Sequence, residues 1–151
     1  MLRDDIKTAT ITSMKAGDSA RTGTLRLIAS SLKNRDIELR TGTPPADDDV
    51  LVAEVLSKMA KQRRESIEMF VLGNRPELAD AERAELAIIE SFMPAQMSPE
   101  DARAAITALV TELGATSVKD MGKVMAAVKE RFAGQLDMGA AGAMVKAALA
   151  G

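Results

Sequence analysis

Two groups of lysine and arginine are the residues of this chain best suited to chemistry, and that chemistry is the binding of phosphate or another anion. The first group lies in one predicted helix and consists of Lys61, Arg63 and Arg64. Arg63 follows Met59 by four residues and precedes Ile67 by four, so it falls on the apolar stripe of that helix. A charge there must be paired or reach outward to solvent. The alternative to an anion contact is therefore a salt bridge to Glu85 or Glu90 of the next helix.

The second group lies nearer the C-terminus, on the polar side of another predicted helix. Its members are Lys119, Lys123, Lys129 and Arg131. A ridge of this kind contacts an RNA backbone through charge alone, without reading its sequence. Asp120 and Glu130 lie beside these cations, so an ordinary solvated helix face is the alternative.

The composition excludes several classes of active site. The chain has no histidine and no cysteine, which removes the imidazole base, the thiol nucleophile and every nitrogen or sulfur metal ligand of those types. The sequence contains no glycine-rich phosphate loop and no Gly-x-Ser-x-Gly elbow. We therefore predict no catalytic residue, no cofactor and no metal site.

The overall charge also limits the partners. The net charge is −2 and the pI is about 5.3, with acidic and basic residues nearly balanced in both halves of the chain. An autonomous DNA-binding domain is usually basic, so we expect no DNA partner. Three phenylalanines are the only aromatic residues, which leaves little for single-stranded bases to stack on.

Three consecutive carboxylates, Asp47, Asp48 and Asp49, are the remaining candidate for metal chemistry. Consecutive side chains at the start of a helix point in different directions, and no further ligands follow at the spacing of a calcium-binding loop. We interpret them as acidic residues that stabilise the positive end of a helix.

Apolar residues recur every three to four positions almost throughout, and alternating β-branched runs are absent, which predicts an all-α fold. The expected helices cover about residues 2–16, 20–40, 48–72, 75–92, 99–113, 118–133 and 138–150. Met14 and Leu78 are among the residues expected to face the core. Asn74 with Glu77 is expected to form a capping box after Gly73 ends the preceding helix.

A proline-marked boundary at residues 93–97 divides the prediction into a four-helix N-terminal unit, 1–93, and a three-helix C-terminal unit, 94–151. Ser98, Pro99, Glu100 and Asp101 then give a strong helix start. No run of 18 apolar residues and no secretory signal are present, so we expect no membrane partner and a cytoplasmic location.

One stretch of the C-terminal unit, GATSVKDMGKVM at residues 114–125, combines a helix end and a helix start. Gly114 suits a left-handed position after a helix, and Ser117 with Asp120 resembles a capping box. Gly122 then lies inside the new helix, where glycine is unfavourable, so we expect a neighbouring helix or a ligand to approach its backbone closely. The residues of interest are Gly114, Ser117, Asp120, Met121, Gly122, Val124 and Met125.

This stretch resembles the C-terminal domain of the GatB/YqeY family, which occurs as the tail of a tRNA amidotransferase subunit and in small free-standing YqeY-like proteins. Further similarity lies in the segment KQRRES at 61–66 and in FMPAQ at 92–96. The resemblance implies an all-α protein whose C-terminal part is similar to a tail that contacts tRNA. It carries across no active site. Family members often have Gly-Lys-Ala-Asp where this chain has GQLD at 134–137, so one candidate phosphate-binding lysine is missing.

Three functions follow as hypotheses. The first is an accessory module that binds tRNA or a tRNA-charging or amidotransferase complex through the basic groups. The second is a helical adaptor that binds an unknown protein partner and no RNA; the acidic pI, the scarcity of aromatic residues and the methionine-rich C-terminal unit favour it. The third is glutamine-dependent carbon–nitrogen ligase activity, which the family association suggests but the residues do not, since no nucleophile constellation is visible.

Overall fold

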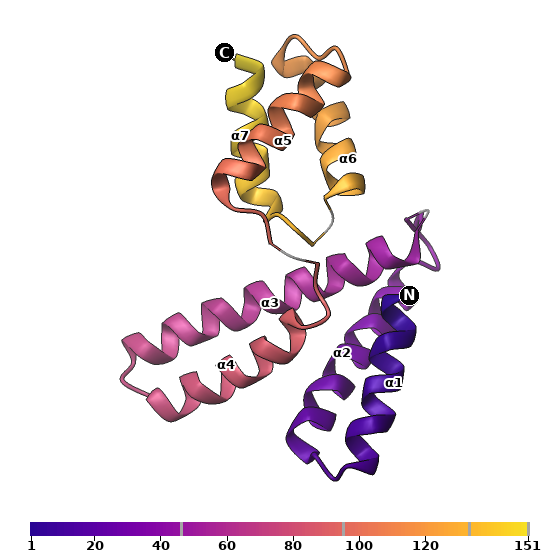
Figure 1. Ribbon diagram of the computed structural model, residues 1–151, viewed down its shortest axis with the longest axis vertical. Helices are drawn as coiled ribbons and strands as arrows, with labels where there is room; N and C mark the ends of the chain where they lie inside the picture. The colour runs from indigo at the N-terminus through magenta and orange to yellow at the C-terminus, as the bar shows by residue number, and fades with distance from the viewer. Residues whose placement is uncertain (46, 95, 133, 151) are drawn as a thin grey trace. The chain divides into compact units, whose positions relative to one another are not determined.

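The computed structural model describes residues 1–45, 47–94, 96–132 and 134–150 (Figure 1). Within these ranges every regular element is a helix, so the predicted all-α class is confirmed. The chain divides into two compact units, Met1–Met93 (unit 1) and Pro94–Gly151 (unit 2), and each unit has its own apolar cluster. That the units fold independently stays a prediction.

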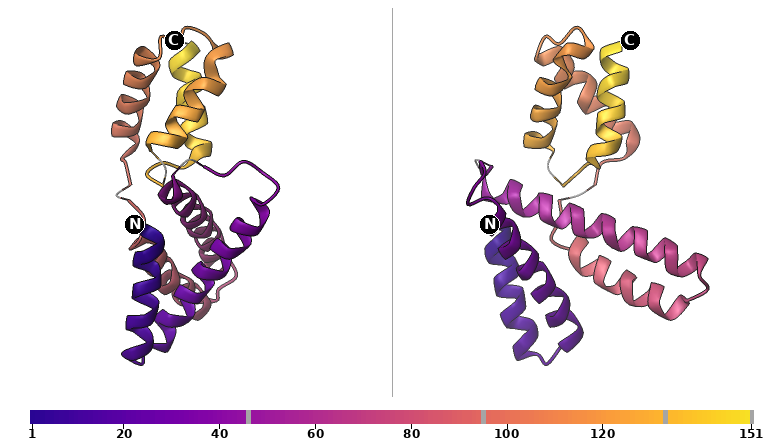
Figure 2. Two further views of the ribbon diagram at one scale, coloured as in Figure 1. Left: turned by 90° about the vertical axis from the view of Figure 1, so that its right-hand side faces the viewer. Right: turned by 180° about the vertical axis from the view of Figure 1, so that it is seen from behind.

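Unit 1 consists of two antiparallel helical hairpins. The first pairs α1 (Leu2–Lys15) with α2 (Ser19–Glu38), and the second pairs α3 (Asp48–Leu72) with α4 (Pro76–Glu90). Figure 2 shows the two hairpins splaying apart from the end where α2 leads into α3. All four helices contribute to one buried cluster, whose fully buried large residues are Leu25, Ile28, Val52, Leu56 and Ile89.

Unit 2 consists of three helices around a smaller cluster. They are α5 (Pro99–Glu112), α6 (Met121–Arg131) and α7 (Met138–Ala150), and a single 3₁₀ turn, η1 (Val118–Asp120), precedes α6. The cluster is built from Ile106, Leu109, Val124, Val128 and Val145. Ala133, the expected end of the sixth helix, and Ala46 and Ala95, in the two expected breaks, lie outside the described residues. Among the residues described, no helix is both long and apolar enough to cross a bilayer.

The helix starts follow local sequence closely. Four side chains at helix starts accept a hydrogen bond from a backbone N–H of the first turn, at 2.9 to 3.1 Å: Asp18, Asp47, Ser98 and Asp137. Each satisfies one of the N–H groups that a helix leaves without an internal partner.

The turn between α3 and α4 differs from the prediction. Asn74 does not cap α4; it takes a left-handed conformation with φ of 55°, whereas Gly73 has an ordinary φ of −81°. Arg75 N–H donates to the Phe70 carbonyl at 2.8 Å, so Asn74 occupies the position after the end of α3 at which glycine is usual. Arg75 then precedes α4 with no side-chain capping bond.

Two residues expected in the core are exposed. The Met14 side chain lies on the outside of the first hairpin and approaches the Arg26 guanidinium, with the residue 52% exposed. Leu78 lies in the first turn of α4, beyond the reach of the buried cluster, and is 38% exposed. Both lie on the correct helical period, but no neighbouring element covers them fully.

Candidate nucleic-acid interface

The start of α6 is held by the pair of residues that the sequence predicted. The Ser117 side chain and the Asp120 side chain each bond to the other residue's backbone, which completes a capping box with aspartate as its acid. Asp120 Oδ2 also accepts a hydrogen bond from Thr116 N at 3.0 Å. Gly114 has a φ of 65°, as a left-handed residue after α5 requires. These bonds fix where the first turn of α6 points.

The inner face of α6 is buried and its outer face is open. Val124 and Val128 are fully buried, and Met121 and Met125 pack partly against the same cluster. Gly122 faces outward, and a Cβ placed there would have no heavy atom within 4 Å. The expectation of a helix packed against Gly122 is therefore wrong, because the neighbouring helices lie on the valine side.

Exposed lysines border this open backbone. Lys119 lies in η1, one turn before Lys123, and both are exposed. The Lys123 ammonium donates to the Leu113 carbonyl at 3.3 Å, so it also satisfies a carbonyl at the end of α5. Lys119 and Lys123, four residues apart on one side of the helix, and the bare Gly122 backbone beside them form what we call the Lys119–Lys123 face.

The other two predicted cations of this region do not join the Lys119–Lys123 face. Lys129 follows Lys123 by six residues, which places it about 120° away around the helix. Arg131 makes two bonds to Glu112 of α5, at 2.6 and 2.9 Å. The pKa of Glu112 is lowered and the pKa of Arg131 is raised, in both cases chiefly by this hydrogen bonding. The predicted ridge of four is therefore a pair of lysines.

The basic group of unit 1 forms ion pairs between helices, as the structural alternative predicted. Arg63 Nε lies 2.7 Å from Glu85 Oε2 and 3.4 Å from Glu82 Oε2, and its side chain is only 18% exposed. Arg64 bonds to Glu90 at 2.7 Å. Both arginines thus tie α3 to α4, and of this group Lys61 alone is left as an exposed cation without a carboxylate partner among the described residues. An anion would have to displace these carboxylates to bind here.

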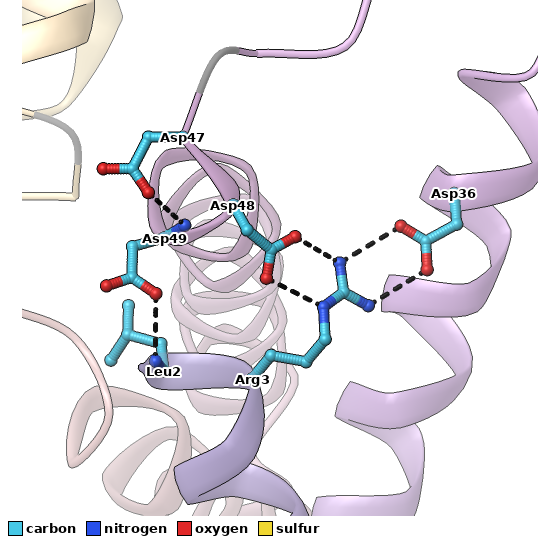
Figure 3. A network of polar contacts seen from close by, with 6 residues as sticks. All are labelled: Leu2, Arg3, Asp36, Asp47, Asp48 and Asp49. Carbon is cyan, nitrogen blue, oxygen red and sulfur yellow. Dashed lines mark hydrogen bonds and ion pairs between the residues drawn. The ribbon is translucent and has the colours of Figure 1, made fainter.

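The three aspartates at the start of α3 each have a separate structural role (Figure 3). Asp47 accepts from Asp49 N at 2.9 Å, Asp49 accepts from Leu2 N at 3.0 Å, and Asp48 pairs with Arg3 at 2.8 Å. The described residues contain no group of three acidic side chains placed to hold a metal ion.

Arg3 is a residue that sequence reasoning missed. Its guanidinium bonds both carboxylate oxygens of Asp48 and both of Asp36, so it joins α1, α2 and α3 at the end where the hairpins meet (Figure 3). The pKa of Arg3 is raised by the hydrogen bonds to Asp48 and Asp36, and the pKa of Asp48 is lowered by Arg3. Nothing in the spacing of these residues along the chain predicts the contact.

We expect Arg3→Ala to destabilise unit 1 by about 1 kcal/mol at neutral pH, since the carboxylates are half exposed and solvent screens the pairs. Because the folded-state pKa of Asp48 lies below its ordinary value of 3.8, its contribution is complete above that pH and is lost as the pH falls through the lower folded value. Urea unfolding from pH 7 to pH 2 should show the difference between wild type and variant shrinking only below about pH 4. Arg103→Ala, at an exposed position of α5, should unfold at the same urea concentration as the wild type at every pH.

Comparison with known proteins places this architecture in a family. The family model described as Yqey-like protein matches residues 2–149. A protein of Eremothecium gossypii named altered inheritance of mitochondria protein 41, mitochondrial, is 34% identical over 99% of this chain and 79% of its own length. Its namesakes from Kluyveromyces lactis and Lachancea thermotolerans are 31% and 32% identical over 74% of the chain, which spans little more than half of their length.

The names of these relatives correct one expectation. All three are named as mitochondrial proteins, which overturns the cytoplasmic location predicted from the sequence. The prediction relied on the absence of a secretory signal, and that absence does not distinguish the cytoplasm from an organelle. The family model matches residues 2–149, and the Eremothecium gossypii relative aligns with 99% of this chain. The chain therefore belongs to the family of YqeY-like proteins.

Proposed function

We propose that this protein is an accessory RNA-binding module, and that unit 2 contacts the backbone of tRNA through the Lys119–Lys123 face. The observation that carries the proposal is the exposure of two lysines on one helix side next to Gly122, where the absence of a side chain lets a phosphate approach the helix surface. The resemblance of residues 114–125 to the amidotransferase tail supports tRNA as the RNA. A role beside a glutamine-dependent tRNA amidotransferase, without catalysis by this chain, follows from that resemblance.

Charge, and not the helix terminus, supplies the attraction in this proposal. The capping box already occupies η1, the turn that leads directly into α6, and its Asp120 carboxylate lies at this positive end. A phosphate is therefore held by the two ammonium groups. Since Arg131 is neutralised by Glu112, the interface makes about two phosphate contacts and its affinity is modest.

The buried hydroxyl of Ser13, a group that acyl-transfer chemistry could use, has structural partners. The Ser13 hydroxyl, which lines a hollow of about 410 Å³ between α1 and α2, bonds to the Thr22 hydroxyl at 2.7 Å and to the Thr10 carbonyl at 2.9 Å. No imidazole exists in the chain to activate it. This supports an accessory role over glutamine-dependent ligase activity of the chain by itself.

Titration of the purified full chain with tRNA at a series of salt concentrations tests the proposal. Two phosphate contacts predict that the logarithm of the observed association constant falls with the logarithm of the salt concentration with a slope of about −1.4 to −1.8. Saturable binding with a slope in that range supports the proposal. Binding that is absent even at low salt, where nonspecific attraction is strongest, contradicts it.

Gly122 gives a second test with two readouts. Gly122→Ala should stabilise the protein by about 0.5–1 kcal/mol, since alanine favours helix and the added methyl has space. The same methyl should weaken tRNA binding severalfold, because it covers the open backbone beside the two lysines. Thermal unfolding and a binding titration on one preparation measure both, and a stabilised variant with unchanged affinity would remove Gly122 from the interface.

A further inference from the structure

The free end of the α3/α4 hairpin exposes four apolar side chains that the core of unit 1 does not use. In the last turn of α3, Met69 is 72%, Val71 53% and Leu72 87% exposed, and Leu78 follows in the first turn of α4. Single exposed apolar residues are normal on a protein surface, but several together at one end of an element mark an interaction site.

The length of α3 explains why these residues have no cover. Its 25 residues extend over about 37 Å, and its buried residues all lie between Leu51 and Ala60. Beyond Ala60, α4 packs beside it within unit 1, and the hairpin projects away from α1 and α2 (Figure 2). The ion pairs of Arg63 and Arg64 with α4 hold this projecting part together without apolar burial on its outer side.

Two glutamates share the outer face with the exposed apolar residues. Glu65, Glu68, Met69 and Leu72 have the spacing i, i+3, i+4 and i+7, which places them on one side of α3, opposite the side that carries Arg63. Glu65 and Glu68 are both exposed, and neither has an ion-pair partner among the described residues. The nearest arginines in sequence, Arg63 and Arg64, are already paired with glutamates of α4. Lys61 and Lys58 continue the same side of α3 one and two turns earlier, so the acidic part of the face is confined to the turns that carry Met69 and Leu72.

We propose that this outer face, Glu65, Glu68, Met69 and Leu72, docks an amphipathic helix of a partner protein that presents apolar residues flanked by lysine or arginine. Met69 and Leu72 are an apolar pair at i, i+3, a spacing by which one side of a helix contacts a second helix. The two carboxylates form no ion pair and lie next to the apolar residues, while the lysines lie further back, so this end of the face selects a basic flank. A second copy of this chain would bring two more carboxylates to the same border, so a self-pair lacks the matching charge. The face is distinct from the Lys119–Lys123 face and adds a protein partner to the proposed RNA contact.

Model peptides of defined composition test the inference on the full chain. One peptide of about 18 residues, five helical turns, has leucine on one face and lysine on the other, and its isomer has glutamate in place of lysine. Fluorescence anisotropy should show saturable binding of the leucine–lysine peptide only. Met69→Glu with Leu72→Glu should weaken that binding at least tenfold, and Glu65→Lys with Glu68→Lys should do the same.

Matched controls separate this face from general attraction of a cationic peptide to an acidic protein. Ile11→Glu with Leu27→Glu replaces exposed apolar residues of unit 1, and Asp4→Lys with Asp5→Lys reverses an exposed acidic pair of α1. Neither pair should change peptide affinity. All four variants should stay folded, since every replaced side chain is exposed. Asp4→Lys with Asp5→Lys should lower the unfolding temperature slightly, because it places positive charge in the first turn of α1. Met69→Glu with Leu72→Glu should leave tRNA binding unchanged.

Several results would overturn the inference. Equal binding of both peptides, or peptide binding that survives Met69→Glu with Leu72→Glu, would show that the face is not the docking surface. Self-association of the wild type that this variant abolishes would identify a second copy as the occupant instead of a basic helix.

Discussion

Replacing Ile106 with alanine will remove much of the stability of unit 2 while unit 1 keeps its own. Ile106 is fully buried at the centre of the cluster that α5, α6 and α7 share, and truncating such a side chain costs about 2–5 kcal/mol. A unit of this size, Pro94–Gly151, is stabilised by only about 3–8 kcal/mol on typical per-residue values, so the loss removes most of its stability. Backbone amide hydrogen exchange, read residue by residue, will show protection lost in unit 2 alone.

Two control variants test whether the loss of protection is specific to a buried residue of unit 2. Val118→Ala removes a half-exposed side chain at the start of the same α6 region and should leave exchange nearly unchanged. Ile28→Ala truncates a fully buried residue of the other cluster and should lower protection in unit 1 only. If Ile106→Ala lowered protection equally in both units, the two clusters would be one cooperative core and the division into independently folding domains would be wrong.

Reversing the charge of Lys119 and Lys123 together will weaken tRNA binding at least tenfold at low salt. The double variant removes both proposed phosphate contacts and places two carboxylates beside the same backbone, so attraction becomes repulsion. Both side chains are exposed, and the fold should therefore be retained, with a small loss from the Lys123 contact to the Leu113 carbonyl. Filter binding or anisotropy at two salt concentrations measures the change.

The matched control is Lys7→Glu with Lys33→Glu, which makes the same change of net charge on exposed positions of unit 1. We expect it to reduce affinity only slightly, through the overall field of the protein. Equal losses in the two double variants would show that tRNA responds to net charge alone, and would leave the Lys119–Lys123 face without a specific role.

Local sequence predicted the helices because their signals are local. Apolar spacing, capping side chains and proline positions act within a few residues, and the helix bounds of the structure lie within about two residues of those expected at most ends. Asn74 was the exception: aspartate and asparagine favour both a helix start and a left-handed helix end, and the sequence around it does not decide between the two.

The ion pairs between helices were predictable only where one helix places a charge on the side that faces its neighbour. Arg63 on an apolar stripe demanded a carboxylate on the facing helix, and Glu85 supplies it. Arg3 carried no such requirement, because its partners Asp36 and Asp48 belong to helices whose meeting depends on the whole of unit 1. The prediction that Leu78 faces the core was wrong for a related reason. Periodicity shows which side of a helix is apolar, but it does not show whether another element covers that side.

The most direct test of the proposed function is a map of tRNA contacts on the isotopically labelled full chain by amide chemical-shift perturbation at physiological salt. We predict that the largest chemical-shift changes cluster between Val118 and Ala126, around the exposed backbone of Gly122. The amide shifts of residues 58–72 of α3 should stay unchanged. Perturbations concentrated on α3 near Lys61, or none at tRNA concentrations well above micromolar, would contradict the claim that unit 2 is the RNA-binding part of this protein.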